Sequence, residues 1–324
     1  MSTEKSACRS SVASGAFGLA ITSDGGLPGL NAPSAVAGGR AVRHRLVETG
    51  EVREALARGA LTPLGHDGEG AFRIDYSQFS TGGLLIKTAS FGDHLICDGG
   101  RSVLSCVNGV ERELWQRYVL GQVLPLTASV QGLEIFHASA VAVDDGVVAL
   151  AGPSGAGKSS TAAALLEQGF SFFTDDVLAL DARAFEVTAF PGTTLMGVPR
   201  ARVAALKTHF AGMPWAADER KAMAPMLGDR RALPVRAFFV LAPDDAVSRV
   251  RVGPCRPNRL LATTFDGVSR TPERMRRLLR VGAMLAADGR AFELRYDPGS
   301  DLCGLTKEVL AMINGLEVTS PSAV

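Results

Sequence analysis

Short apolar runs that alternate with polar residues mark the first part of the chain. Residues 1–39 are mostly Ser, Ala and Gly without periodicity, which predicts a mobile N-terminal segment. From residue 40 onward the alternation predicts a β-rich N-terminal domain over residues 40–130, closed by a helix near residues 110–120. Its strands are expected at residues 42–47, 72–76, 83–88 and 94–98.

A second domain is predicted over residues 131–324. Two strands, at 138–143 and 146–150, meet at Asp144-Asp145-Gly146, a hairpin signal because such a turn needs a positive φ that Gly supplies. Thr271-Pro272-Glu273 predicts the start of a helix, with an N-cap, a proline and an acid in the first turn. Further strands are expected at 170–173, 177–181 and 237–242, and the apolar face of the helix at Met275, Leu278, Leu279 and Leu285.

The span of residues 191–234 has no clear period and is rich in Ala, Met, Pro and Arg. A long segment of this kind in a compact domain is often a lid or a substrate loop. We therefore expect it to close over a site. Strands and helices together give an α/β (α+β) fold class.

The strongest chemical signal follows the second strand of the hairpin. The residues there fit the pattern of a phosphate-binding loop, or P-loop: a glycine, any four residues, a second glycine, a lysine and a serine. The backbone N–H groups of such a loop point at phosphate oxygens. Lys158 is expected to reach the β- and γ-phosphates and Ser159 to bind Mg²⁺. The alternative is a glycine-rich turn that happens to hold a lysine. The predicted ATP-binding residues are Gly152, Pro153, Ser154, Gly155, Ala156, Gly157, Lys158, Ser159 and Ser160.

Three Asp-Asp pairs compete for the catalytic role. Asp144-Asp145 is most simply a turn, and Asp244-Asp245 is either a ligand of Mg²⁺-bound water or a solvated loop start. Asp175-Asp176 follows the strand directly after the P-loop helix, from which side chains can reach a γ-phosphate. One carboxylate could accept a hydroxyl proton while the other orients the metal or a basic partner. A plain turn at the strand end is the alternative for this pair.

Two kinds of basic residue have open roles. His137 begins the strand beside the P-loop strand, where it is either an orienting donor near the phosphates or a half-buried histidine bonded to backbone. Eleven arginines lie between residues 249 and 295 against four acids, a surface that could bind an acidic or phosphorylated peptide. Those of the predicted helix more simply form its solvated face: Arg274, Arg276, Arg277 and Arg280.

Composition narrows the class of protein. The 34 basic and 33 acidic residues nearly cancel, which argues against a nucleic-acid partner. No run approaches a membrane span, and the N-terminus lacks the pattern of a secretory signal. Five scattered cysteines without metal-ligand spacing favour reduced thiols. We therefore expect a cytoplasmic protein without a membrane or nucleic-acid partner; the composition leaves monomer and homo-oligomer both open.

Residues 137–181 together resemble the catalytic domain of bacterial HPr kinase/phosphorylase and its relatives. The resemblance is carried by His137-Ala138-Ser139-Ala140-Val141, the hairpin, the P-loop, Gly169 and Thr174-Asp175-Asp176. It implies a P-loop kinase fold similar to phosphoenolpyruvate carboxykinase, ATP and Mg²⁺ as cofactors, and transfer of the γ-phosphoryl group to a serine hydroxyl. It also implies Asp175 as acid/base, Lys158 as phosphate ligand, Ser159 and Asp176 as metal ligands, and His137 as a supporting residue.

The chain departs from the regulatory enzymes of that family. Ser160 stands where they carry glutamate after the Lys-Ser of the loop, and their later Glu-Ile-Arg-Gly signature, tied to phosphorolysis, is absent. The N-terminal half also differs. The chain is thus more similar to HPr-kinase-related proteins of peptide biosynthesis, including kinases that modify lasso-peptide precursors. These departures argue against HPr as the substrate and more strongly against phosphorylase activity.

The sequence therefore predicts a serine kinase that acts on a peptide or protein, with a biosynthetic precursor peptide as one candidate. Two alternatives stay open: a kinase of a small hydroxylated metabolite, and a nucleotide-gated binding module without transferase activity.

Overall fold

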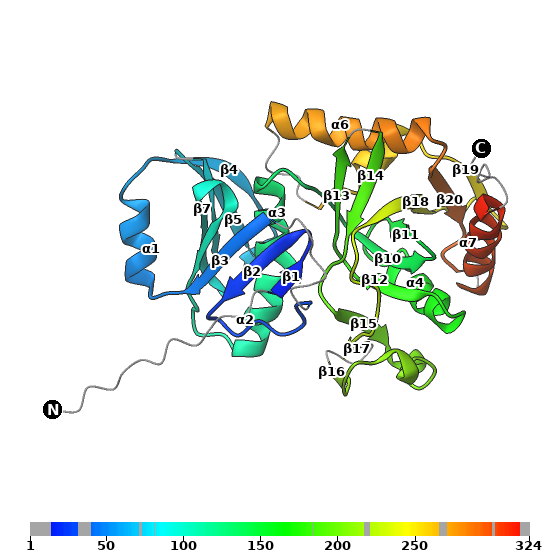
Figure 1. The fold of residues 1–324 in the computed structure, drawn as a ribbon, viewed down its shortest axis with the longest axis horizontal. Helices are drawn as coiled ribbons and strands as arrows, with labels where there is room; N and C mark the ends of the chain where they lie inside the picture. The colour runs from blue at the N-terminus through cyan, green and yellow to red at the C-terminus, as the bar shows by residue number, and fades with distance from the viewer. Residues whose placement is uncertain are drawn as a thin grey trace.

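Two large β-sheets with their helices lie side by side in the computed structural model, and a small third sheet lies at the lower edge (Figure 1). The observed class is mixed α/β. No helix of the described residues is long and apolar enough to cross a membrane. The structure describes residues 14–31, 40–70, 73–80, 82–183, 185–216, 221–265, 271–299 and 302–317.

The first large sheet has eight strands in the order β1-β2-β3-β8-β7-β6-β5-β4. Because successive side chains point to opposite faces, each face buries its own set. Leu85 and Leu95 pack on the face of helix α1 (Thr49–Leu56), whereas Leu84 and Ile96 pack with Trp115 on the other. The strands are β1 (Ser14–Ala16), β2 (Leu19–Ser23), β3 (Arg40–Leu46), β4 (Leu61–Asp67), β5 (Ile74–Phe79), β6 (Gly83–Thr88), β7 (Gly92–Cys97) and β8 (Ser102–Ser105).

A helical run follows this sheet and changes its winding midway. It comprises α2 (Arg112–Tyr118), the π-helical turn η4 (Val119–Val123) and α3 (Leu124–Val130). Pro125 supplies the reason, since a proline inside a helix has no N–H to donate and its ring clashes with the carbonyl four residues earlier. The Leu124 N–H bonds the Val119 carbonyl instead, which inserts a wider turn. The predicted helix near 110–120 exists and extends further than expected.

The second large sheet carries the P-loop. Its main path runs β12-β10-β11-β18-β14-β13-β9, and β20 pairs with both β18 and β19. Because β11, β18 and β20 are parallel, their carboxyl ends share one edge of the sheet. The strands are β9 (Glu134–Phe136), β10 (Ala138–Val143), β11 (Gly146–Ala151), β12 (Ser171–Thr174), β13 (Leu178–Arg183), β14 (Glu186–Phe190), β18 (Leu233–Pro243), β19 (Arg251–Pro254) and β20 (Ala291–Tyr296).

Helices cover both faces of this sheet, which explains why its central strands are apolar on both sides (Figure 1). Helices α4 (Lys158–Glu167) and α7 (Leu302–Glu317) pack on one face. Helices α5 (Pro257–Leu261) and α6 (Pro272–Ala287) pack on the other.

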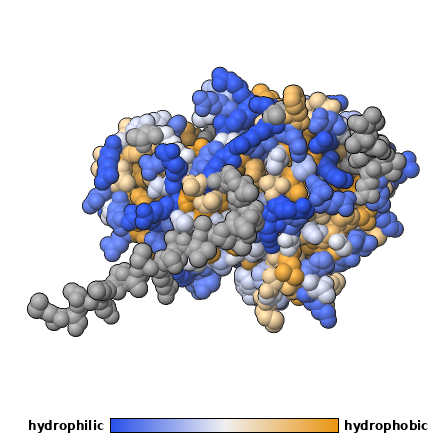
Figure 2. All heavy atoms as spheres, in the orientation of Figure 1, coloured by the Kyte–Doolittle hydropathy of each residue, from blue (hydrophilic) through white to orange (hydrophobic). Residues whose placement is uncertain are grey.

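The span that we expected to be a lid contains a three-stranded sheet in the order β15-β17-β16. These strands are β15 (Leu195–Pro199), β16 (Trp215–Ala216) and β17 (Lys221–Pro225). Figure 2 shows apolar side chains at the lower edge of the molecule, where Figure 1 places the small sheet. Met213, two residues before β16, is 87% exposed. Whether this small sheet moves over the site stays a prediction.

The N-terminal segment differs from expectation. Residues 14–31 are not a mobile tail, because β1 and β2 form an edge of the first sheet and bury Leu19 and Ile21 completely. The short strands were hidden by small residues that give little periodicity. Residues 1–13 and 32–39 lie outside the described residues.

Two local expectations are also wrong in detail. The hairpin turn exists, but its positive φ of 50° falls on Asp144, while Gly146 pairs with Val143 as the first residue of β11. In α6, the Thr271 cap is confirmed by its bond from the Arg274 N–H, yet Leu279 is exposed. The helix packs with Leu278, Val281 and Leu285 on one side.

Candidate active site

The P-loop connects β11 to α4 in the strand, loop and helix order that the sequence predicts. Gly157 caps α4 with φ 84°, a left-handed conformation that glycine adopts without strain. Gly152 has φ 149°, and a Cβ there would lie 2.7 Å from the Leu241 carbonyl oxygen. The loop is therefore shaped for glycine at both ends, and it leads directly into the N-terminus of α4, where the first N–H groups of a helix have no carbonyl of their own helix to bond.

Lys158 is held over the loop by the loop itself. Its Nζ donates to the carbonyls of Gly152 at 2.9 Å and Pro153 at 3.0 Å, and the side chain is buried. Burial lowers the pKa of Lys158, and the nearby Asp176 and Asp175 carboxylates oppose that shift. The ammonium is thus positioned beside the cradle and can exchange a carbonyl for a phosphate oxygen.

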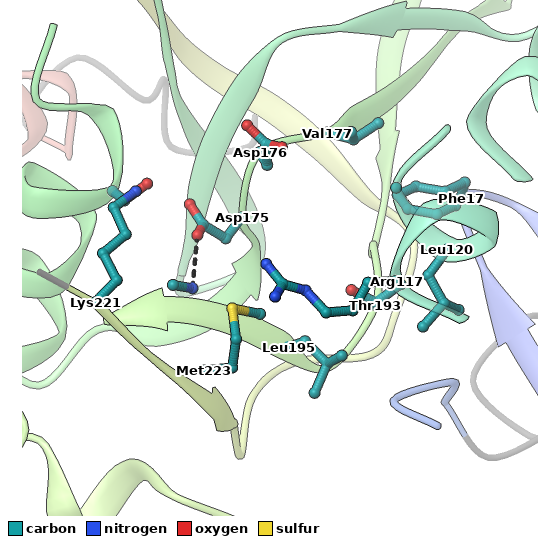
Figure 3. Close-up of a pocket in the computed structure, with 13 residues that line it drawn as sticks. Phe17, Arg117, Leu120, Asp175, Asp176, Val177, Thr193, Leu195, Lys221 and Met223 are labelled. Carbon is teal, nitrogen blue, oxygen red and sulfur yellow. Dashed lines mark hydrogen bonds between the residues drawn. The ribbon is translucent and has the colours of Figure 1, made fainter. Parts of the chain in front are cut away.

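Asp175 is fixed in orientation through both of its oxygens. The Ser139 hydroxyl of β10 donates to Oδ1 at 2.6 Å, and the Gly197 N–H of β15 donates to Oδ2 at 3.0 Å. A carboxylate oxygen has two lone-pair positions, so each oxygen can still accept a proton or a further hydrogen bond. Two different elements therefore aim this carboxylate into the site (Figure 3).

Asp176 forms a pair with His137 at the end of β12. Its backbone takes φ 70°, an uncommon conformation for a residue with a side chain, and its Oδ1 lies 3.3 Å from His137 Nε2. Loss of surrounding water raises the pKa of Asp176, against the influence of His137, although the side chain is 66% exposed toward the pocket. Loss of water likewise lowers the pKa of His137, which Asp176 opposes.

The Asp175 and Asp176 carboxylates border a pocket of about 310 Å³ between the two large sheets (Figure 3). One wall is formed by residues of the second large sheet and the small sheet. The other wall is formed by Phe17, between β1 and β2, and by residues of α2 and η4. The lining residues are Phe17, Arg117, Leu120, Gly121, Ser159, Asp175, Asp176, Val177, Thr193, Leu195, Gly197, Lys221 and Met223.

The structure brings together three predicted site residues in this pocket, Ser159, Asp175 and Asp176. Lys158 and His137 lie close enough to affect the pKa of Asp176. The remaining loop residues, from Gly152 to Gly157, and Ser160 do not line this pocket; Pro153, Ser154 and Gly155 are at the exposed tip of the loop.

Sequence reasoning missed several contributors. Ser139 is a fully buried residue in an otherwise apolar strand. A single polar residue in such a strand is a sequence signal that could have identified Ser139 as a site residue. Lys221 is one of only six lysines, within the span expected to be a lid. Arg117 comes from a helix of the other unit and had no local signal.

The other Asp-Asp pairs lie elsewhere: Asp144-Asp145 is a turn, and Asp244 pairs with Arg295.

Magnesium suits the donors of this pocket. The Ser159 hydroxyl and the Asp176 carboxylate are hard oxygen ligands on the same cavity, and Mg²⁺ in nucleotide sites is held by one or two such groups together with phosphates and water. The residues present therefore fit the expected ion.

The segment that leads into β15, residues 191–194, is bonded to residues 14–31, which form β1, β2 and the turn after them and are called the N-terminal hairpin below. Phe17 N–H donates to the Pro191 carbonyl at 2.7 Å, and the Asn31 side chain donates to the Gly192 carbonyl at 2.8 Å. Thr194 N–H donates to the Gly29 carbonyl at 2.6 Å. The hairpin thus fixes the start of β15, whose Gly197 in turn orients Asp175.

Comparisons with known proteins identify no family. No protein-family model and no curated protein matches the chain. A solved structure, the Hpr(Ser) kinase/phosphatase from Coxiella burnetii, aligns with 57% of this chain and 92% of its own, at 13% sequence identity and a TM-score of 0.31. A TM-score this low carries no argument, so function is inferred from the chain's own residues.

Proposed function

We propose that this protein is an ATP- and Mg²⁺-dependent kinase that transfers the γ-phosphoryl group to a serine hydroxyl of a peptide or protein. One observation carries the proposal: Ser159 of the P-loop helix and the carboxylates of Asp175 and Asp176 line the same pocket. A phosphate cradle alone would suit any nucleotide-binding protein. A cradle whose helix places Ser159 in one pocket with an oriented carboxylate suits transfer to an acceptor.

Each residue of the site has a separate role in this reaction. The loop N–H groups and Lys158 would bind the phosphates, while Ser159 and Asp176 would hold Mg²⁺, which would neutralise phosphate charge. The acceptor oxygen forms a bond to the γ-phosphorus, the bond from that phosphorus to the β–γ bridging oxygen breaks, and ADP leaves. Asp175 accepts the hydroxyl proton. His137 orients Asp176 through the 3.3 Å contact.

A kinase of a small hydroxylated metabolite is the second candidate, and the size of the pocket favours it. A volume of about 310 Å³ is at the low end for a ligand pocket, and α2 and η4 line its wall with Arg117, Leu120 and Gly121. Such a pocket holds one residue or one small molecule. A peptide would insert only its serine and the groups next to it.

The test is mass spectrometry of candidate acceptors after incubation with Mg-ATP. Candidates are peptides and proteins encoded beside this gene, and small hydroxy compounds. We expect a gain of about 80 Da on a serine with the parent protein, because a phosphoryl group replaces a proton. We expect no gain with Lys158→Ala. The matched control Lys87→Ala, an exposed lysine on β6, retains the activity.

Asp175→Asn separates a kinase from a nucleotide-gated binding module. Loss of transfer with retained ATP binding supports the kinase. A parent that binds ATP and a partner but modifies no candidate contradicts the proposed function, and a gain of mass on a metabolite alone assigns the second candidate.

A further inference from the structure

Arg117 reaches the pocket from the wall opposite the P-loop. It belongs to α2, in the helical run of the first sheet, and lines the same cavity as Asp175 and Ser159. Figure 3 shows its guanidinium directed toward the interior of the pocket, on the side of Asp175. The first unit therefore contributes a charged group to the candidate active site.

The Arg117 guanidinium has no hydrogen-bond or ion-pair partner among the described residues, and it is exposed to the pocket. The two neighbouring carboxylates are satisfied differently: Asp175 by Ser139 and Gly197, Asp176 by His137. The five N–H donors of this planar fork thus face the cavity, and neither carboxylate is bonded to them in the described residues. Such a fork matches a carboxylate or phosphate in a two-bond arrangement.

The helix that holds Arg117 changes its winding just after this residue. The π-turn η4 begins two residues later, and its Leu120 and Gly121 line the pocket as well. π-Turns inside helices occur frequently at functional sites because they redirect side chains. Trp115 and Val119, both fully buried, anchor the helix on either side of Arg117. The position of the guanidinium is therefore set by packing.

We propose that Arg117 binds an anionic group of the acceptor, within one residue of the hydroxyl that receives the phosphoryl group. The inference rests on the proposed function and specifies its substrate class: acceptors with a carboxylate or phosphate beside the hydroxyl. The adjacent apolar side chains of Phe17, Leu120 and Met223 would enclose the carbon atoms of the acceptor. Arg117 is thus a residue that determines specificity.

The acceptor is a better ligand for Arg117 than the nucleotide. The phosphates already have the loop N–H groups and Lys158, which lie on the wall of α4. Arg117 lies on the other wall, where the acceptor must approach Asp175. Contact between Arg117 and the transferred phosphoryl group is the competing assignment, and the experiment separates the two.

The experiment offers Mg-ATP and a mixture of matched serine peptides to the parent and to Arg117→Gln. In each pair, the residue before or after the serine is glutamate or glutamine; a further pair ends in serine with a free carboxylate or an amide. Phosphorylation of each member is counted by mass spectrometry. We expect the parent to prefer the anionic member of at least one pair by roughly tenfold or more, since hydrogen bonds to charged groups have that effect.

Arg117→Gln should bring that preference close to unity, and Arg117→Lys should retain part of it. Arg58→Gln, an exposed arginine at the end of the first helix, is the matched control and should keep the full preference. An unchanged preference in Arg117→Gln overturns the inference. Equal slowing of both members also overturns it, because that result assigns Arg117 to the phosphoryl group. The pair that responds distinguishes a side-chain carboxylate from a terminal one.

A second measurement does not need transfer. The same peptides are selected on immobilised protein loaded with Mg²⁺ and a non-transferable ATP analogue. Enrichment of anionic members on the parent but not on Arg117→Gln supports the inference even if no peptide is phosphorylated, in which case the proposed function alone fails. Absence of enrichment on the parent overturns it. Equal melting temperatures of parent and variant show that the fold is intact.

Discussion

At the scale of single residues, the orientation of Asp175 is the feature on which catalysis depends most. Replacing Ser139 with alanine removes the 2.6 Å bond to Oδ1 and leaves the Gly197 N–H as the remaining described donor. A hydrogen bond to a charged group contributes about 1.5–3 kcal/mol, so we expect kcat to fall roughly 10- to 100-fold. Nucleotide affinity should change little, because Ser139 does not line the pocket. Steady-state kinetics of the transfer measures both.

Ser171→Ala is the control for that experiment. Ser171 is an exposed hydroxyl on β12, three residues before Thr174, and pairs in the ladder with Ala142. Its loss should leave kcat within about twofold of the parent. Should Ser139→Ala raise KM for ATP without lowering kcat, Asp175 would not be the group that Ser139 positions for the chemical step.

The sequence was sufficient for residues whose signal is local. The P-loop and Asp175-Asp176 are recognisable because glycine spacing and a strand end are written in consecutive residues. Ser139, Lys221 and Arg117 join them from three other elements, and only the folded chain brings these together. Arg274 shows the same limit: we expected it on the solvated face of α6, yet it is 4% exposed, 3.6 Å from the buried Glu134.

At the scale of elements, the N-terminal hairpin positions the small sheet. We expect Asn31→Ala to destabilise the protein by about 1–3 kcal/mol, because the buried Gly192 carbonyl loses its side-chain donor at 2.8 Å. The loosened segment precedes β15, so kcat of the transfer should also fall. Urea unfolding and transfer kinetics on one preparation measure the two effects.

Asn108→Ala provides the comparison, since the exposed Asn108 side chain also donates to a backbone carbonyl, that of Ala89, at 2.8 Å. Water can replace an exposed donor, so its loss should cost less than about 1 kcal/mol and leave transfer unchanged. Equal losses of stability from the two substitutions would show that the hairpin contact has no special role.

Elements with strong periodic or turn signals were predicted at the right residues. How the strands pair with one another in the sheets was not predicted. The strands at 83–88 and 138–143 have the expected bounds. The parallel neighbours of β11 and β2 depend on contacts distant in sequence. The short β1 and β2 were missed because they are only three and five residues long and their small residues give little periodicity.

At the scale of the whole molecule, one apolar core joins the two large sheets. Trp115 and Val119 of the helical run belong to the same buried cluster as Ile135, Val177 and Leu195 of the second unit. This core crosses the predicted boundary between residues 130 and 131, so the division into domains stays a prediction. It also explains how a rigid wall can place Arg117 opposite the P-loop.

The same core holds two neutral histidines that should make the protein sensitive to acid. Burial lowers the pKa of His44 to about 4 and of His94 to about 3. In the unfolded chain both titrate near ~6.5, so between pH 6.5 and 4 the unfolded state binds more protons than the folded state. Stability is therefore complete above pH 6.5 and falls on acidification, by about 1.4 kcal/mol per pH unit for each histidine.

Urea unfolding between pH 7 and 4.5 measures this slope. His94→Gln should lower stability at neutral pH, because the ring packs against Trp115 and Tyr118 and bonds Ser105, but it should reduce the acid slope by about half of the histidine contribution. His66→Gln, an exposed histidine on β4, should keep the slope of the parent. An acid slope that is identical in all three proteins would show that His94 is not excluded from protonation in the folded state.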